Sequence, residues 1–227
     1  MAPEEFVSLT DIDPTIRTDI RFATANNFVG TPLNGYTSPL CLLTRTAAQG
    51  LSRAQAALSA TGHALLVLDG YRPTRAVAHV TRWARDPDDQ RMKSEFFPHT
   101  AKERLFTDGY LYEWSGHSRG STVDVTLVTS EGAQLDMGTP YGRFDARSRT
   151  VHPQIRGAQR LHRALLKDTM ERAGFVNSSA EWWHYTFGAE PFPDVYFDFP
   201  VSAESLHRTA GRAPGASPVI PAQRSGD

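Results

Sequence analysis

The sequence has almost no cysteine: Cys41 is the only one among 227 residues. An internal disulfide is therefore impossible, and a zinc site built from several thiolates is excluded. Any metal ion would have to be held by histidine and carboxylate side chains. The chain contains 8 histidines and 25 acidic residues, so such a site can be assembled.

An excess of charge of one sign and long apolar runs are also missing. The 24 Lys and Arg residues balance the 25 Asp and Glu residues, which gives a formal net charge of −1. This balance argues against nucleic acid or an anionic membrane as a partner. No run of about 18 apolar residues occurs, and the opening MAPEEFVSLTDIDP lacks a basic segment followed by an apolar one. We therefore expect a cytoplasmic protein.

Length and composition favour a single globular domain. Hydrophobic residues make up 40% and charged residues 22% of the chain, as in globular proteins with a packed core. After Val201 the sequence becomes rich in Pro, Gly, Ala and Ser and loses its periodicity. We expect one domain over residues 1–201 and a disordered tail over residues 202–227. Nothing in the sequence indicates an oligomeric state.

Helices and strands are both predicted. Apolar residues recur at helical spacing in residues 42–58, 73–83 and 155–172. Strand candidates are residues 64–70, 122–128 and 182–187, with a weaker one at 19–22. Because these elements mix without a regular βαβ repeat, we expect an α+β fold with a central antiparallel sheet and flanking helices.

The stretch SGHSRGSTVDVTL, residues 115–127, carries the first candidate site residues. In a strand, alternation sends its Val and Leu side chains to the core and Asp124 into a polar cleft. Gly116 and Gly120 allow a turn that brings His117 to the same point. The alternative is that His117 caps a turn and Asp124 accepts hydrogen bonds from nearby backbone N–H groups.

The second stretch is EWWHYTF, residues 181–187. Its aromatic residues are typical of a core, in which His184 would be an ordinary buried side chain. A carboxylate beside such groups, however, is costly to ionise unless a cation is close. The same surroundings would give Glu181 the basicity of a general base near neutral pH. Because positions 181 and 184 of an ideal strand face opposite ways, one site for both requires a bend.

Together, His117, Asp124 and His184 supply two imidazoles and one carboxylate. This donor set suits Zn²⁺ with a fourth position for water, and it could also hold Fe(II). Glu181 favours zinc, because hydrolysis needs a base for the attacking water and oxygenase chemistry does not.

A third stretch, DGYRP at residues 69–73, places Arg72 at the end of a predicted buried strand. Its guanidinium could bind a substrate carboxylate or the oxyanion of a tetrahedral intermediate. The alternative is a structural salt bridge with Asp69.

DGYRP, SGHSRGSTVD and EWWHY, in this order and at these separations, resemble the motifs of the VanX-type zinc D-alanyl-D-alanine dipeptidases. That family belongs to the D-Ala-D-Ala metallopeptidases, which share a fold with lysostaphin-like endopeptidases and the hedgehog signalling domain. The similarity extends from about Asp19 to Val201. The patterns SxHxxGxxxD and ExxH are typical of the whole group, and the double tryptophan narrows the resemblance to the dipeptidases.

The resemblance implies a set of roles. His117, Asp124 and His184 would bind one zinc ion on the sheet. Glu181 would be the catalytic base and later the proton donor, and Arg72 would stabilise the oxyanion. The implied reaction is hydrolysis of D-Ala-D-Ala, or a closely related D,D-dipeptide, by a zinc-bound water in a small closed cavity.

The residues expected to contact the dipeptide include one departure from the family. Ser115 and Tyr36 match positions near the bound substrate. After the turn at residues 137–139, the family generally has an aromatic residue and then an Asp that holds the substrate ammonium, but this chain has Tyr141-Gly142. Asp145 is the expected substitute, unless the substrate differs from D-Ala-D-Ala.

Three other functions remain open. A cell-wall D,D-carboxypeptidase or endopeptidase would use the same residues but needs export and an open cleft. A non-catalytic, zinc-stabilised binding module of the hedgehog type would not need Glu181. An iron oxygenase is the most distant alternative. The sequence does not decide between a role in glycopeptide resistance and one in salvage of cell-wall dipeptides.

Overall fold

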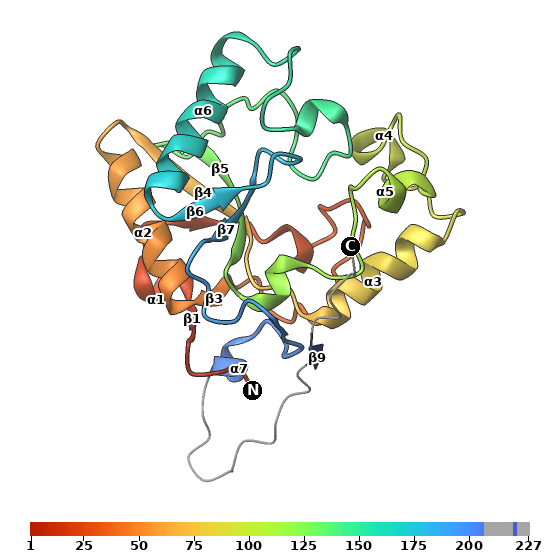
Figure 1. Ribbon diagram of the computed structural model, residues 1–227, viewed down its shortest axis with the longest axis horizontal. Helices are drawn as coiled ribbons and strands as arrows, with labels where there is room; N and C mark the ends of the chain where they lie inside the picture. The colour runs from red at the N-terminus through yellow and green to blue at the C-terminus, as the bar shows by residue number, and fades with distance from the viewer. Residues whose placement is uncertain (207–219, 222–227) are drawn as a thin grey trace.

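The computed structural model describes residues 1–206 and 220–221, and its centre is a five-stranded sheet (Figure 1). The strand order is β2 (Arg17–Thr18), β4 (His63–Asp69), β5 (Thr122–Thr129), β7 (His184–Phe187) and β6 (Phe175–Asn177). All neighbouring strands are antiparallel except β2 and β4, which are parallel. The predicted α+β fold is confirmed, with one parallel pair at the edge of the sheet.

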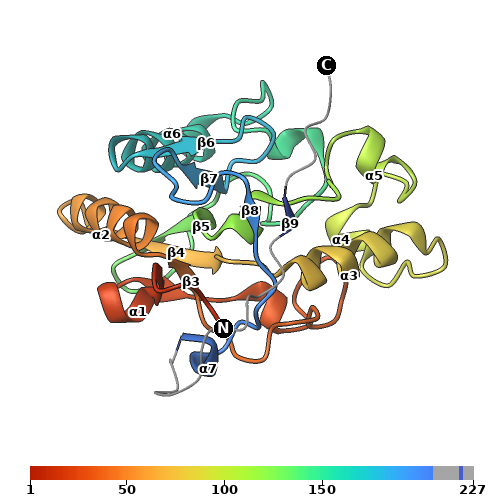
Figure 2. The same ribbon diagram turned by 60° about the horizontal axis from the view of Figure 1, so that its bottom comes forward.

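Two long helices, α2 (Arg45–Ser59) and α6 (Gly157–Arg172), cover one face of the sheet (Figure 2). Their apolar stripes are buried against it, as the helical spacing predicts. Gly50 permits the close approach of α2, because a Cβ there would lie 2.9 Å from ring carbons of both Phe175 and Phe187. On the opposite side of the molecule lie α3 (Thr74–Arg85), α4 (Lys93–Phe96) and α5 (Arg104–Thr107).

The alternation predicted for β5 is confirmed. Val123, Val125 and Leu127 are fully buried in the main core beneath α2 and α6. Val128 belongs to a small second cluster with Leu66 on the other face. Asp124 and Thr126 lie on that second face, which carries the polar site.

The remaining elements are short. They are β1 (Phe6–Ser8), α1 (Leu9–Ile12), β3 (Leu42–Thr44), α7 (Ala203–Leu206), β8 (Val195–Tyr196), β9 (Ile220–Pro221) and the 3-10 helices η1 (Arg21–Ala23), η2 (Gly116–Arg119) and η3 (Ala146–Ser148). β1 pairs with β3, and β8 pairs with β9.

Three predicted boundaries are wrong. Residues 42–44 are a strand rather than the start of a helix, because they pair with residues 6–8 near the amino terminus. The strand expected at 19–22 is replaced by η1, since the pairing of β2 with β4 ends at Thr18 and the chain then turns. Finally, β7 begins at His184 rather than at Trp182 because both tryptophans lie in a turn.

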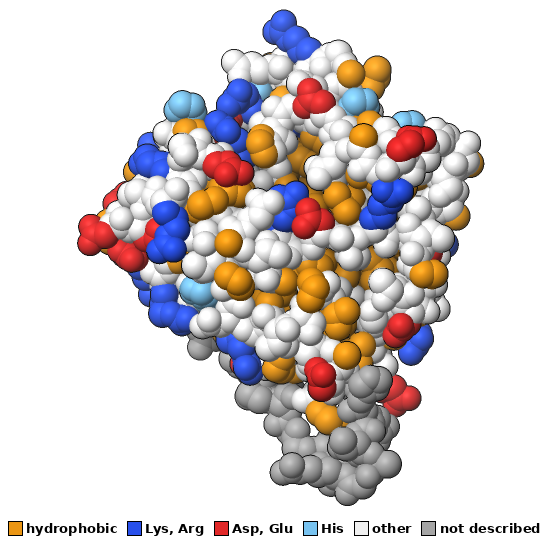
Figure 3. Space-filling model, turned by 180° about the vertical axis from the view of Figure 1, so that it is seen from behind, with side chains coloured by type: hydrophobic (Ala, Val, Ile, Leu, Met, Phe, Trp, Pro, Cys, Tyr) orange, Lys and Arg blue, Asp and Glu red, His pale blue; other side chains and the backbone are white. Residues whose placement is uncertain are grey.

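The chain stays packed beyond Val201. The short helix α7 lies at residues 203–206, and the N–H of Ala2 donates to the carbonyl of Ser205 (2.9 Å). The rest of the expected tail, 207–219 and 222–227, lies outside the described residues. Within the described ranges, none of the helices combines the length and the apolar character needed to cross a membrane. On the face shown in Figure 3, basic and acidic side chains are interspersed, in keeping with the balanced charge.

Candidate metal centre and active site

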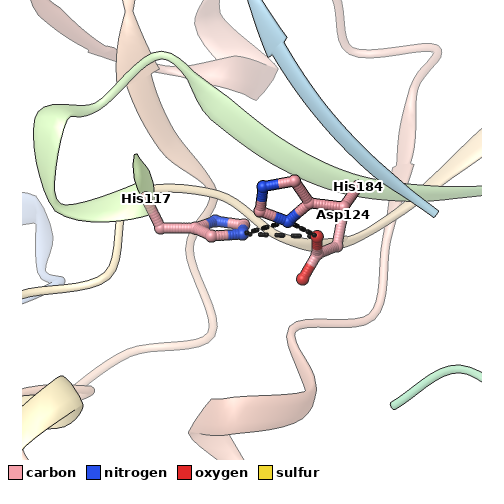
Figure 4. A group of neighbouring side chains, drawn as sticks. All are labelled: His117, Asp124 and His184. Carbon is pink, nitrogen blue, oxygen red and sulfur yellow. Dashed lines mark hydrogen bonds and ion pairs between the residues drawn. The ribbon is translucent and has the colours of Figure 1, made fainter. Parts of the chain in front are cut away.

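The three predicted metal ligands converge on one point (Figure 4). Asp124 on β5 and His184 at the start of β7 are directly paired across the sheet, and His117 reaches them from η2. Nδ1 of His184 and Nε2 of His117 lie 3.1 and 3.3 Å from Oδ1 of Asp124. The two imidazole nitrogens are 3.3 Å apart. All three potential ligand atoms lie within 4.8 Å of one another.

A backbone contact fixes the orientation of His117. Its Nδ1 lies 2.8 Å from the carbonyl of Gly70 and must donate to it, because a carbonyl only accepts. Nε2 is then the nitrogen that faces the cluster, in the form that can bind a metal. The residue is almost fully buried.

Asp124 is held as an anion. Burial alone would raise the pKa of Asp124, but the adjacent His117 and His184 lower it well below its usual range. Its second oxygen, Oδ2, accepts a hydrogen bond from the Tyr141 hydroxyl (2.9 Å) and lies 3.6 Å from Nη2 of Arg72. Oδ1 of Asp124 is therefore directed at the two histidines, while Oδ2 accepts the hydrogen bond from Tyr141. This anionic donor between two imidazoles fits the chemistry of a zinc site.

Two of the three potential ligands belong to a row of residues that are paired across three neighbouring strands. Asp69 on β4 is paired with Asp124, which is paired with His184. A register shift between Val67 and Asp69 brings Asp69 into this row. The fully buried Asp69 carboxylate accepts hydrogen bonds from the Tyr36 hydroxyl (2.6 Å) and from Nε and Nη2 of Arg72 (3.0 and 2.8 Å).

Arg72 lies between Asp69 and the metal cluster. It forms the salt bridge with Asp69, and it also lines the cavity beside the metal cluster. Its guanidinium lies 4.5 Å from the centre of the Phe22 ring. Burial would lower the pKa of Arg72, but Asp69 and other neighbours raise it, so the group stays charged.

Glu181 lies in the turn that precedes β7, so the bend required by the sequence is present. The N–H of His184 donates to the carbonyl of Glu181 (3.3 Å), and Oε2 of Glu181 lies 3.7 Å from Nδ1 of His184. Burial raises the pKa of Glu181 to about 7, while the His184 and Arg72 charges oppose this rise. A carboxyl group with this pKa can both accept and release a proton near neutral pH.

These groups surround a cavity of about 190 Å³. Ser115 lines it, as do Tyr141 and Gly142. Tyr36 does not line it and lies behind Asp69 instead.

The structure does not bring Asp145 into this cavity. Its carboxylate pairs with Arg147 (2.7 and 3.0 Å), which lowers the pKa of Asp145 to about 2. It faces a separate surface pocket with His99 and His152. The geometry therefore gives no support to the expectation that Asp145 replaces the ammonium anchor.

A buried arginine on α6, which the sequence analysis missed, holds the loop that carries Tyr141 and Gly142. Arg163 donates to the carbonyls of Met137 (2.6 Å), Arg147 (2.9 Å) and Arg149 (2.6 Å). Its pKa is lowered to about 10 by burial. The sequence did contain a signal, because Arg163 lies on the buried stripe with Leu166 and Met170.

A family model described as Peptidase M15, D-ala-D-ala dipeptidase, matches residues 2–202. The chain belongs to this peptidase family. The resemblance inferred from the three motifs is thus confirmed over nearly the whole described chain.

Several D-alanyl-D-alanine dipeptidases are similar over most of the chain. The protein from Streptomyces coelicolor is 38% identical over 205 residues, covering 87% of this chain and 98% of the relative. The protein from Enterococcus faecalis is 39% identical over 198 residues, with the same coverage. The Escherichia coli protein is 33% identical over 181 residues, covering 80% and 83%.

A solved structure of a mutant of the vancomycin resistance D,D-pentapeptidase VanY with Zn(II) also matches. Its TM-score is 0.40 and its identity is 17%, and the match covers 69% of this chain and 78% of the other.

Proposed function

We propose that this member of the dipeptidase family is a zinc enzyme that hydrolyses D-Ala-D-Ala, or a closely related D,D-dipeptide, to free amino acids. The observation that carries the proposal is one small cavity that combines the His-Asp-His cluster, a carboxyl group with a pKa of about 7 and a charged arginine. The names of the similar dipeptidases support the choice of substrate.

His117, Asp124 and His184 would hold the zinc ion. When bound, zinc supplies Lewis acidity for the scissile carbonyl and lowers the pKa of a water molecule. The structure provides the orienting contacts that such ligands need: Nδ1 of His117 donates to the Gly70 carbonyl, and the Tyr141 hydroxyl donates to Asp124.

The side chains of the cavity perform the proton transfers and stabilise the charge. Glu181 accepts a proton from the attacking water and passes it to the amine nitrogen that leaves. Arg72 donates to the carbonyl oxygen as negative charge develops there, and Asp69 holds its guanidinium in place. We assign Ser115 to direct contact with the dipeptide and Tyr36 to indirect support through Asp69.

The size of the cavity favours a dipeptidase over a cell-wall D,D-carboxypeptidase or endopeptidase. Pockets for drug-sized ligands usually enclose about 300–1,000 Å³, and this cavity encloses about 190 Å³. A dipeptide suits such a space better than a peptidoglycan strand does. A non-catalytic zinc module would not require the raised pKa of Glu181.

A substrate panel with parallel zinc analysis tests the proposal. D-Ala-D-Ala, its L,D and L,L counterparts and a peptidoglycan pentapeptide are assayed with the wild type. Only the D,D-dipeptide should be cleaved well. Glu181→Ala should keep its zinc and lose about 10²–10⁴-fold in kcat, whereas His117→Ala should lose both zinc and activity. Absence of D-Ala release from every dipeptide by the zinc-loaded protein would refute the proposal, as would wild-type activity of Glu181→Ala.

We also propose that the enzyme acts in the cytoplasm on a small dipeptide, without nucleic acid or membrane partners. This rests on the sequence composition, and cell fractionation with an antibody against the chain tests it.

A further inference from the structure

The cavity has few charged side chains, and each already has a task. The charged or imidazole groups that line it are Arg72, His117, Asp124, Glu181 and His184. Among the described residues, Asp124 and Glu181 are the only carboxylates in this lining. Asp124 faces the two histidines and accepts a hydrogen bond from Tyr141, and Glu181 is the proposed base.

This matters for a free dipeptide, which carries an ammonium group and a carboxylate near neutral pH. The positive charge of Arg72 attracts the substrate carboxylate, although its donors are assigned to the carbonyl oxygen that is attacked. In either orientation of the dipeptide, however, its ammonium group meets no carboxylate that is free to pair with it. A buried cation without a counter-charge is costly compared with the same cation in water.

Four aromatic rings form part of the cavity wall. The ring centroid of Phe28 lies 4.9 Å from that of Phe144 and 5.5 Å from that of Phe22, and the Tyr110 ring packs on Phe144 at 5.6 Å. All four rings line the cavity. This surface suits a methyl or acyl group. Ring faces attract a cation, but this attraction is weaker than a charge-assisted hydrogen bond.

Gly142 brings bare backbone to the cavity wall beside Phe28. A Cβ at this position would lie 3.5 Å from Phe96 and 3.7 Å from Phe28, which is ordinary van der Waals contact. The position therefore has room for the first atom of a side chain. Its φ of 74° is left-handed, and Asp and Asn tolerate that region better than most other residues do.

We propose that the enzyme prefers D,D-dipeptides whose α-amino group is uncharged, and above all those acylated by a small group such as formyl or acetyl. The inference rests on the proposed function and concerns the substrate class of the same site. For N-acetyl-D-Ala-D-Ala, water adds across the amide bond between the two alanines. The carbon–nitrogen bond breaks, and N-acetyl-D-Ala and D-Ala are released without a further reactant.

The first test compares kcat/KM for D-Ala-D-Ala and N-acetyl-D-Ala-D-Ala with the zinc-loaded wild type. We expect the acetylated substrate to be favoured by about tenfold to a hundredfold, the range set by one lost charge-assisted hydrogen bond. If the free dipeptide is cleaved as efficiently or better, the inference is wrong and the proposed function stands. If neither is cleaved, the proposed function itself fails.

Gly142→Asp and Gly142→Asn form a matched pair of variants. Asp should lower the KM for the free dipeptide and reduce the preference for the acetylated one by about tenfold or more. Asn has nearly the same shape and backbone preference but no charge, so it should leave the preference within about twofold of wild type. Equal shifts in both variants would show that shape rather than charge decides, which would overturn the inference.

The pH dependence of the preference gives an independent readout. An α-amino group loses its charge near about pH 8. The ratio of the two kcat/KM values should therefore fall as the pH rises from 7 to about 9.5. Ionisations of the free enzyme, including the phenols of Tyr110 and Tyr141 in the lining, act on both substrates alike and cancel in this ratio. A ratio that does not change with pH would contradict the proposal.

Discussion

The Tyr141 hydroxyl is a sensitive point in the proposed zinc site. It donates to Oδ2 of Asp124 at 2.9 Å, and the Asp124 side chain is only 4% exposed. Tyr141→Phe removes the hydroxyl and keeps the ring. The Arg72 guanidinium at 3.6 Å is too distant for a good hydrogen bond, so no protein group replaces the lost donor.

Two estimates of the effect agree. A hydrogen bond to a charged group contributes about 1.5–3 kcal/mol. Loss of an outer partner of a metal ligand typically weakens metal binding by about 10–100-fold, and each tenfold step equals about 1.4 kcal/mol. We therefore expect Tyr141→Phe to raise the dissociation constant for zinc by one to two orders of magnitude.

Competition against a chromophoric chelator measures this constant directly, without a substrate. Tyr110→Phe is the matched control, because Tyr110 lines the same cavity and its hydroxyl has no hydrogen-bond partner among the described residues. The control should bind zinc within about twofold of wild type. Wild-type zinc affinity in Tyr141→Phe, or an equal loss in both variants, would refute the reasoning.

Three further outcomes follow from the same structure. Arg72→Lys should lower kcat by about 10²–10³-fold with zinc content unchanged, because a lysine cannot pair with Asp69 through two nitrogens and still present a donor to the substrate. Steady-state kinetics measures kcat, and metal analysis of the same sample measures the zinc content. Arg163→Met should lower the free energy of unfolding in urea by about 2–4 kcal/mol, because three loop carbonyls lose their donor, whereas the exposed Arg160→Met should change it by less than about 0.5 kcal/mol. Removal of zinc with a chelator should lower Tm, and added zinc should restore it. With free zinc at 100 times its Kd, the bound ion adds about 2.7 kcal/mol to the free energy of unfolding.

Much of the site could be predicted because its evidence is local. Alternation along β5 placed Asp124 on the face opposite the core, and the structure confirms it. The spacing of Glu181 and His184 required a bend, and that bend is present. Such inferences need only the period of a strand and the cost of a buried charge.

The remaining features depend on contacts between distant segments. Residues 42–44 have the apolar pattern of the helix that follows, and only their pairing with residues 6–8 makes them a strand. The sequence indicates Asp69 only as a salt-bridge partner of Arg72, and that pair is present; the register shift on β4 also places Asp69 opposite Asp124. The path of the loop after Met137 depends on Arg163, so no local pattern could predict that Asp145 turns away from the cavity.

The row of paired residues across β4, β5 and β7 has a consequence for the kinetics of folding. Asp124 and His184 are 60 residues apart in the sequence, and His117 and His184 are 67 apart. The complete metal site therefore forms only after distant strands have paired, a slow step in which loop closure is costly. Zinc should then leave the folding rate nearly unchanged and slow the unfolding rate, so the zinc-bound protein gains kinetic stability.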